Sequence, residues 1–236
     1  MDAEVVAAPA KLTVTLRITG VRPDGFHLID AEMVTLDLAD TLVIRRGDGL
    51  DVTGASGLVV PVGPDNLVAR ALALVGRTAH VELTKRIPAG AGLGGGSADA
   101  AAILRWAGFT DLDAAARLGA DVAFCLVGGR ARVSGIGEIV EPLPPVARTF
   151  TLLTPPFGCS TPAVYAMWDE MGGPTTDGPN DLEPAALRVE PRLVEWRDSL
   201  GDATGESPVL AGSGSTWFVE GAFAGEGRVV TRTDRP

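Results

Sequence analysis

The sequence predicts a layered, sandwich-like α+β fold, and three observations support this prediction. Apolar and polar residues alternate over residues 12–19, which is the period of a half-buried strand. A glycine-rich loop over 88–97 leads into an alanine-rich segment, 98–106, that favours a helix. Near the C-terminus, residues 209–219 have the pattern of a strand, a tight glycine turn and a second strand.

The first half of the chain is predicted to hold most of the strands. The turn sequence at 22–25 joins the strand 12–19 to a returning strand over 26–38. Asp40 precedes a short strand at 41–46, and another is expected at 50–60. A helix begins at 64–66 and stops at Gly76, and a strand at 79–84 then enters the glycine loop.

The second half of the chain differs from the first in amino-acid composition. A short helix is expected at 112–118, with strands near 131–133 and 149–154. Prolines and glycines dominate residues 155–180, and two short helices follow at 184–187 and 191–200. This shift predicts a boundary between 145 and 155, and therefore an N-terminal domain of residues 1–148 and a C-terminal domain of residues 149–236.

Composition and charge exclude several classes of function. The 236 residues are 46% hydrophobic, which is enough for a substantial core. The net charge of −10 disfavours a nucleic-acid partner. No apolar run is long enough to span a bilayer, so no membrane partner is expected. Cys125 and Cys159 are expected to be free thiols and the N-terminus lacks a signal peptide, so a cytoplasmic location is predicted.

The segment 85–97 is the strongest functional signal. Glycines let a backbone wrap closely around a phosphate, and the N-terminus of the following helix attracts negative charge. A dinucleotide pattern is matched formally at Gly90, Gly92 and Gly95, but no apolar strand leads directly into it. A Walker A loop is excluded because Gly96 stands where its lysine is required. A flexible surface loop is the alternative to a nucleotide phosphate site.

Three charged residues are candidates for chemistry. Lys11 and Lys85 are the only lysines, since the other 18 basic residues are arginine. Asp121 is the sole charge in the apolar run 118–127, and a buried carboxylate needs a partner. Beside Lys11 it would accept or orient a hydroxyl proton. The alternatives are that Asp121 caps a helix and that the lysine usage is chance.

Several blocks in order resemble the GHMP kinase superfamily. They are Pro9-Ala10-Lys11, the glycine loop, the segment 118–122 and the segment 211–215. Within the superfamily, the segments 20–27, 65–67, 159–162 and 180–183 are most similar to the kinases that phosphorylate the 2-hydroxyl of 4-diphosphocytidyl-2-C-methyl-D-erythritol in the non-mevalonate isoprenoid pathway. The resemblance implies a ribosomal S5 domain 2-like N-terminal domain and a ferredoxin-like C-terminal domain.

The resemblance also implies an ATP-dependent kinase with ATP and Mg²⁺ as cofactors. By motif position it makes Lys11 and Asp121 the catalytic pair, with Ser97 near the metal. Asn66 and Lys85 would lie on the adenosine side. The residues implied to hold the triphosphate are Pro88, Ala89, Gly90, Ala91, Gly92, Leu93, Gly94, Gly95, Gly96, Ser97 and Ala98.

The same resemblance implies a cytidylyl substrate that is bound by the hairpin turn carrying Phe26 and His27. The cytosine ring would stack between Phe26 and Tyr165. The alternatives are that Phe26 and Tyr165 are core residues and that His27 is a surface turn residue. The family usually has asparagine at the position of Thr13 and tyrosine at that of Phe26. The other residues implied on the substrate side are Thr13, Gly212 and Ser213.

Two rival functions remain open at this point. Another GHMP kinase of the homoserine or mevalonate type would not need the aromatic pair around the hairpin turn. A non-catalytic nucleotide-binding relative would keep the pocket, and the short segment between Trp106 and Leu118 favours it, whereas retention of both Lys11 and Asp121 argues against it. A monomer or weak homodimer is expected.

Overall fold

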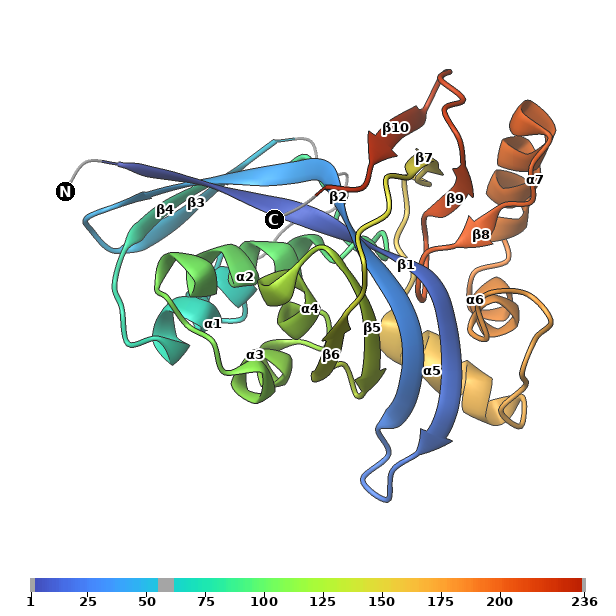
Figure 1. Ribbon diagram of the computed structural model, residues 1–236, viewed down its shortest axis with the longest axis horizontal. Helices are drawn as coiled ribbons and strands as arrows, with labels where there is room; N and C mark the ends of the chain where they lie inside the picture. The colour runs from blue at the N-terminus through green and yellow to red at the C-terminus, as the bar shows by residue number, and fades with distance from the viewer. Residues whose placement is uncertain (1–2, 55–61, 235–236) are drawn as a thin grey trace.

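The computed structural model describes residues 3–54 and 62–234. Within them, two sheets lie beside each other with helices packed against them (Figure 1), which confirms the predicted α+β class. The larger sheet has the order β3-β4-β2-β5-β6, with β1 along the other edge of β2, and the smaller has the order β10-β7-β9-β8. The strands are β1 (Glu4–Val21), β2 (His27–Arg45), β3 (Gly49–Thr53), β4 (His80–Thr84), β5 (Arg130–Gly135), β6 (Ile139–Pro142), β7 (Thr149–Leu153), β8 (Val209–Leu210), β9 (Trp217–Glu220) and β10 (Arg228–Arg232).

The helices divide between the two sheets. The first group lies against the larger sheet, and the second lies beside the β1–β2 hairpin and the smaller sheet (Figure 1). In the described residues, no helix combines the length and apolar character needed to cross a membrane. The first group is α1 (Leu67–Leu74), α2 (Gly95–Trp106), α3 (Leu112–Leu118) and α4 (Val122–Val127), and the second is α5 (Thr161–Glu170), α6 (Glu183–Val189) and α7 (Leu193–Thr204).

The hairpin of β1 and β2 is longer than predicted. Its antiparallel register runs from Glu4 opposite Ile44 to Val21 opposite His27. The expectation of a separate strand at 41–46 is wrong, because β2 continues through Asp40 without a break. The second edge of β2 pairs with β5 near the hairpin tip and with β4 near its far end. Backbone pairing along both edges therefore carries the strand past a polar residue.

Other boundaries also differ from the prediction. β3 ends at Thr53, and most of the rest of the predicted strand 50–60 lies outside the described residues. α2 begins at Gly95 and not at residue 98, because Gly94 adopts the left-handed conformation that starts it. α5 was missed within a segment rich in proline and glycine. Its Ser160 caps the N-terminus and Pro162 lies in the first turn, where proline needs no hydrogen bond.

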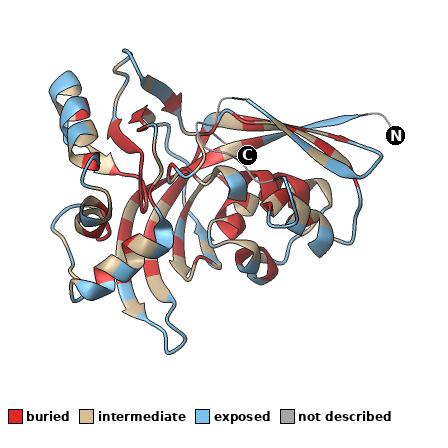
Figure 2. Cartoon of the chain, turned by 180° about the vertical axis from the view of Figure 1, so that it is seen from behind, coloured by how far each residue is buried: buried red, intermediate tan, exposed pale blue. Residues whose placement is uncertain are grey.

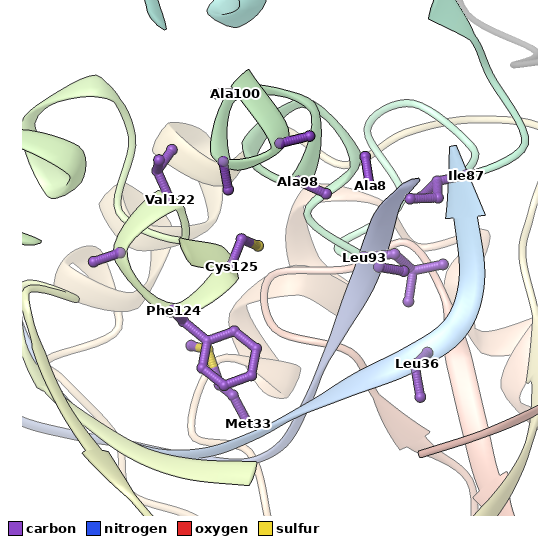
Figure 3. Packing of buried hydrophobic residues seen from close by; sticks show 14 of the residues in the cluster. Ala8, Met33, Leu36, Ile87, Leu93, Ala98, Ala100, Val122, Phe124 and Cys125 are labelled. Carbon is purple, nitrogen blue, oxygen red and sulfur yellow. The ribbon is translucent and has the colours of Figure 1, made fainter. Parts of the chain in front are cut away.

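Two clusters of buried apolar side chains form the core, and β1 contributes to both. Leu12 and Val14 belong to the larger cluster, and Leu16 and Ile18 to the smaller. Alanines on α2 let that helix approach the sheet closely, as Figure 3 shows. Figure 2 shows the buried residues gathered where helices meet strands, with the hairpin tip exposed. The division into domains 1–148 and 149–236 remains a prediction, because Phe150 of β7 packs in the larger cluster.

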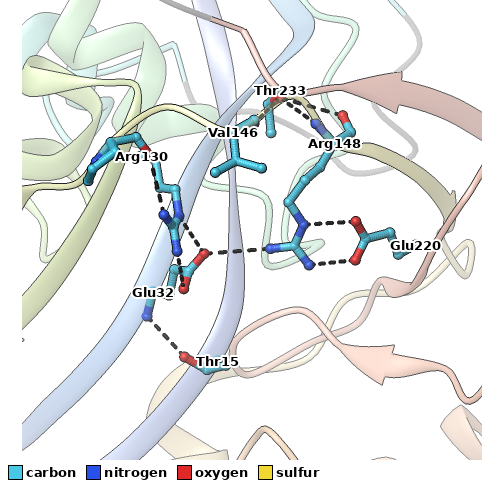
Figure 4. Close-up of polar contacts among 8 residues, drawn as sticks. Thr15, Glu32, Arg130, Val146, Arg148, Glu220 and Thr233 are labelled. Carbon is cyan, nitrogen blue, oxygen red and sulfur yellow. Dashed lines mark hydrogen bonds and ion pairs between the residues drawn. The ribbon is translucent and has the colours of Figure 1, made fainter.

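A polar cluster joins the two sheets (Figure 4). The Glu32 carboxylate on β2 accepts from Arg130 at 2.8 and 3.1 Å. It also lies 3.5 Å from Arg148, which donates to Glu220 on β9 at 2.8 Å. Cys125 and Cys159 are both free and buried, which confirms the prediction of free thiols.

Asp181 attaches the second group of helices to β1. Its buried carboxylate accepts from the Arg17 guanidinium at 2.7 Å, from the backbone N–H of Ile18 at 3.0 Å and from that of Thr176 at 3.2 Å. A parallel bridge between Leu16 and the neighbouring residue 180 continues this contact. The segment 180–183 noted in the sequence therefore has a structural role at this junction.

We predict that Asp181→Ala lowers the free energy of unfolding by about 2–3 kcal/mol, because the Ile18 N–H is left buried without an acceptor. The Arg17 side chain is partly exposed, so its ion pair adds little to this loss. Urea unfolding monitored by circular dichroism measures the change. Asp198→Ala, which removes an exposed pair with Arg197, is the matched control and is expected to have little effect. Equal losses in the two variants would contradict the proposed attachment.

Candidate active site

The glycine loop connects β4 to α2 and leaves the N-terminus of α2 open. Gly94 occupies the N-cap position with φ of 68°, and no side chain of the described residues caps the helix. The first-turn N–H groups are therefore available to an anion. Gly92 has φ of 78°, and a Cβ there would overlap the carbonyl oxygen of Ala211. Glycine at this position lets the loop pass against the turn between β8 and β9.

A cavity of about 370 Å³ opens over this loop. Its wall includes Asn66, whose Oδ1 caps α1 by accepting from the backbone N–H of Val68 at 2.8 Å. The structure thus brings the predicted loop residues and Asn66 together. The residues predicted for nucleotide binding that line it are Asn66, Lys85, Pro88, Ala89, Gly90, Ala91, Gly92, Gly94, Gly95, Gly96 and Ser97, while Leu93 and Ala98 are buried in the larger core.

Lys11 and Asp121 face each other beside this cavity. The Lys11 Nζ lies 3.2 Å from the Asp121 carboxylate and donates to the Thr13 hydroxyl at 3.0 Å. A Cβ on Gly94 would lie 2.7 Å from Lys11 Cγ, so glycine there makes room for the lysine stem. Asp121 occupies the N-cap position of α4 but makes no capping hydrogen bond, so its carboxylate is directed to Lys11. The pair expected from the sequence is therefore formed.

A second cavity of about 550 Å³ lies on the other side of this pair. It extends from Lys11 and Thr13 to the tip of the β1–β2 hairpin and to α5. The two cavities share three lining residues, Gly92, Asp121 and Thr161. Asp121 therefore belongs to the walls of both cavities.

Aromatic side chains line the far end of the second cavity. Phe26 is 57% exposed, so the alternative that it is a core residue is wrong. The His27 ring packs on Tyr165 with centroids 4.7 Å apart, and its side chain is only 10% exposed. His27 is therefore not a surface turn residue. It is His27, not Phe26, that contacts the Tyr165 ring in the described structure.

The turn between β8 and β9 completes the wall of the second cavity. Gly212 and Ser213 line it, and the Ser213 hydroxyl shares a hydrogen bond of 2.8 Å with that of Thr161. The buried Asn180 amide donates to the carbonyl oxygens of Leu210 and Gly212 at 2.9 and 2.7 Å. Asn180 thus holds this turn in place.

Lys85 lies in a buried ion cluster that the sequence analysis missed. Its ammonium pairs with Asp40 and, at 2.6 Å, with Asp99. Asp40 also accepts from the backbone N–H groups of Arg86 and Ile87 at the entrance to the glycine loop. The structure does not test the proposed contact of Lys85 with adenosine. The positive charge of Lys85 is already balanced by the carboxylates of Asp40 and Asp99. The cluster fixes the start of the loop.

Two signals in the sequence point to this cluster. Asp99 is the only acidic residue in the alanine-rich segment 98–106, and Asp40 interrupts an otherwise alternating strand. The pKa of the Asp99 carboxyl is raised to about 7, chiefly because the group is buried; the Lys85 charge opposes this shift and the Asp40 charge adds to it. The Asp99 Oδ1 atom is buried without a hydrogen-bond partner in the described structure.

The donors around Ser97 suit Mg²⁺ that arrives with phosphates. In residues 3–54 and 62–234, no three His, Cys, Asp or Glu side chains are grouped to hold a metal by themselves. Mg²⁺ takes oxygen ligands and commonly combines one or two protein groups with substrate phosphates and water. Ser97 and Asp121 line the first cavity and carry oxygen groups of this kind, so the residues present fit the ion.

Comparison with known proteins agrees with this fold. The family model described as GHMP kinases N terminal domain matches residues 66–129, which include α1, the glycine loop and α4. A solved structure of a homoserine kinase from Cytophaga hutchinsonii aligns over 99% of this chain and 95% of that chain with a TM-score of 0.63 and 19% identity, a likeness of fold. The fold and the site therefore define a GHMP kinase.

Relatives with higher sequence identity show which family within the GHMP kinases the chain belongs to. The 4-diphosphocytidyl-2-C-methyl-D-erythritol kinase of Paracoccus denitrificans is 42% identical, with 92% of this chain and 86% of the relative aligned. The kinase of the same name from Ruegeria pomeroyi is 37% identical over 93% and 88%. A crystal structure of 4-(cytidine 5'-diphospho)-2C-methyl-D-erythritol kinase gives a TM-score of 0.77 at 30% identity, covering 98% of this chain and 100% of that chain. The chain belongs to the 4-diphosphocytidyl-2-C-methyl-D-erythritol kinase family.

The Asp99 carboxyl makes a pH-dependent contribution to stability. Its pKa in the folded protein is about 7, against about 3.9 in an unfolded chain. Between these values the folded state holds a proton that the unfolded state releases. We therefore predict that this group makes the free energy of unfolding fall as pH rises from about 4 to about 7, by on the order of 1 kcal/mol per pH unit.

Asp99→Asn removes this titration and is expected to flatten that part of the profile. Urea unfolding of both proteins across this pH range gives the difference between them. Asp113→Asn, in the first turn of α3, is the control for loss of an acidic residue. Parallel profiles for wild type and Asp99→Asn would show that Asp99 is ionised throughout.

Proposed function

We propose that the chain transfers the γ-phosphoryl group of ATP to the 2-hydroxyl of 4-diphosphocytidyl-2-C-methyl-D-erythritol. The observation that carries this proposal is that two cavities share Gly92, Asp121 and Thr161 in their walls, with the Lys11 ammonium 3.2 Å from the Asp121 carboxylate. A phosphoryl donor and an acceptor alcohol bound in the two cavities would meet at Asp121. Phosphoryl transfer depends chiefly on such positioning and on charge neutralisation.

The glycine loop would hold the triphosphate. Its glycines allow close approach, and the open N-terminus of α2 offers N–H groups to phosphate oxygens. Asn66 and the predicted adenosine-side Lys85 lie in the wall of the same cavity. Mg²⁺ bound with ATP would neutralise phosphate charge, and we propose that the Ser97 hydroxyl helps to hold it.

Lys11 and Asp121 would act on the acceptor hydroxyl. The carboxylate can accept the hydroxyl proton or orient the hydroxyl for attack, and the Lys11 ammonium lies 3.2 Å from it. Lys11 also offers positive charge where negative charge builds up on the transferring group. Thr13 holds the ammonium in this position through its hydroxyl. Gly212 and Ser213 would form the wall against the acceptor.

The outer end of the second cavity would bind the cytidylyl group. Phe26 presents an exposed ring at the hairpin tip and lines the same cavity as Tyr165 on α5, and a pyrimidine can stack on an aromatic ring of either residue. The reaction belongs to the non-mevalonate isoprenoid pathway.

We further propose a cytoplasmic location, which the buried free thiols Cys125 and Cys159 support. A monomer or weak homodimer remains a prediction.

Asp121→Asn is expected to lower kcat by about 10²–10⁴-fold, because the amide cannot accept the proton, while ATP affinity is retained. Turnover is measured with Mg²⁺ and three acceptors, namely the cytidylyl substrate, homoserine and mevalonate. ATP binding is measured by calorimetry on the same preparations. Asp113→Asn is the control. An Asp121→Asn enzyme with undiminished turnover would show that the carboxylate has no role in proton transfer. Turnover of the wild type with homoserine or mevalonate, and none with the cytidylyl substrate, would contradict the proposed acceptor.

Phe26→Ala is expected to raise KM for the cytidylyl substrate by about tenfold, which corresponds to a stacking contact of about 1–1.5 kcal/mol. KM for ATP is expected to be unchanged, because Phe26 lines only the second of the two cavities. Steady-state kinetics with each substrate varied in turn gives both values. Val21→Ala removes another exposed apolar side chain of the same hairpin and is the control. Equal increases in both KM values would argue against stacking.

A further inference from the structure

The turn between β8 and β9, residues 211–216, is in direct contact with the glycine loop. The Thr216 N–H donates to the carbonyl oxygen of Ala91 at 3.1 Å. A Cβ on Gly92 would overlap the carbonyl oxygen of Ala211, so the two backbones pass each other without space for a side chain. A displacement of the turn 211–216 would therefore disturb the loop that is proposed to hold the phosphates.

The same turn lies against the Lys11 ammonium. Gly212 has φ of 60°, and a Cβ built on it would lie 3.6 Å from Lys11 Nζ and 3.8 Å from the hydroxyl oxygen of Thr13. The ammonium in turn lies 3.2 Å from the Asp121 carboxylate. The backbone of the turn thus forms part of the surroundings of the catalytic pair as well as of the glycine loop.

The Asn180 side chain holds one end of this turn. Its Nδ2 atom donates to the carbonyl oxygens of Leu210 and Gly212 at 2.9 and 2.7 Å, and its Oδ1 atom accepts from the Leu182 N–H at 2.9 Å. Both N–H groups of the amide are therefore used. Asn180 is only 2% exposed, so water does not readily replace these hydrogen bonds when they are lost.

The backbone on both sides of Asn180 is bonded to β1. The Leu16 N–H donates to the carbonyl oxygen of Pro179 at 2.8 Å, and the Asp181 N–H donates to the carbonyl oxygen of Leu16 at 3.0 Å. The strand that receives these bonds also carries Lys11. Asn180 is thus fixed to the strand that carries the lysine, while its amide is bonded to the turn that the lysine contacts.

We propose that Asn180 is a positioning residue for phosphoryl transfer. Its amide fixes Gly212 relative to β1, and so sets the distance between the Lys11 ammonium and the turn 211–216 that packs on the glycine loop. In the described structure Asn180 lines neither of the two cavities, so it acts through these groups and not by contact with a ligand.

The inference rests on the proposed function, because it concerns the alignment of a phosphoryl donor with an acceptor hydroxyl. Phosphoryl transfer is sensitive to such alignment, and a displacement of about 1 Å caused by a residue outside the reacting groups can lower a rate by about 10²-fold. Loss of the Asn180 donors is therefore expected to lower kcat more than it weakens the binding of either substrate.

The test compares two neighbouring residues in the full chain. Asn180→Asp keeps the size of the side chain and an acceptor for the Leu182 N–H, but it lacks the amide donors. Asn180→Ala is the second variant, in case the new carboxyl group prevents folding. Asp181→Ala is the matched control, because its carboxylate bonds to β1 and Thr176 and to no described residue of the turn. Urea unfolding gives the stability of each variant.

Two measurements are made on each protein. The chain has only two lysines, Lys11 and Lys85, so ¹³C-labelled lysine gives two Cε signals, which are assigned with Lys11→Arg. The Lys11 signal reports the surroundings of the ammonium and does not require turnover. Steady-state kinetics with ATP and the cytidylyl substrate gives kcat and both KM values.

Both Asn180 variants are expected to shift the Lys11 signal and to leave the Lys85 signal in place. Their kcat is expected to fall by about 10²-fold, while each KM changes by less than about threefold. Asp181→Ala is expected to be less stable than the wild type, with both lysine signals and kcat unchanged. This contrast separates a loss of alignment from a loss of stability.

An unchanged Lys11 signal in the Asn180 variants, an undiminished kcat, or an equal loss of kcat in Asp181→Ala would overturn the proposal. Failure of the proposed function is seen separately, as absence of turnover by the wild type with the cytidylyl substrate. In that case the Lys11 signal still decides whether Asn180 positions the ammonium.

Discussion

Antiparallel pairing of β1 with β2 is the constraint on which the rest of the structure depends. β1 contributes side chains to both apolar clusters and β2 to the larger one, so the paired strands link the helices of the first group to those of the second. Lys11 lies along this ladder, Asp40 lies on the opposite strand, and His27 begins that strand beside the hairpin tip. Side chains alternate between the two faces of a strand, so a register slip of one residue would turn Lys11 away from Asp121.

Attraction of a polyanion by this protein relies on backbone groups more than on free side-chain charge. The chain carries a net charge of −10, and the ammonium of Lys85 is already matched by Asp40 and Asp99. Lys11 is likewise paired with Asp121. The groups left to bind phosphate oxygens are the N–H groups of the glycine loop and of the open N-terminus of α2. They act by direct hydrogen bonding at short range, where the net charge of the protein has the least effect.

Local signals account for the elements that the sequence predicted well. The α1 helix follows a capping Asn66 and is followed by Gly76, and α3 follows a capping Asp111, so each helix carries its own boundaries. α5 was missed because glycine and proline density suggested a loop, although Pro162 is compatible with a first helical turn. The β2 strand was divided at Asp40 because the partners that satisfy this carboxylate lie 45 or more residues away.

The sequence by itself determined the α+β class and the glycine loop before a helix, since each depends on residue type and spacing, and its resemblance to the GHMP kinases singled out Lys11 and Asp121 by motif order. Only the tertiary structure decided that Lys85 faces two buried carboxylates and that His27 packs on Tyr165 beside Asp169. The reason is physical. These contacts join elements far apart along the chain, and which side chains meet depends on how whole sheets and helices pack, which no local pattern encodes.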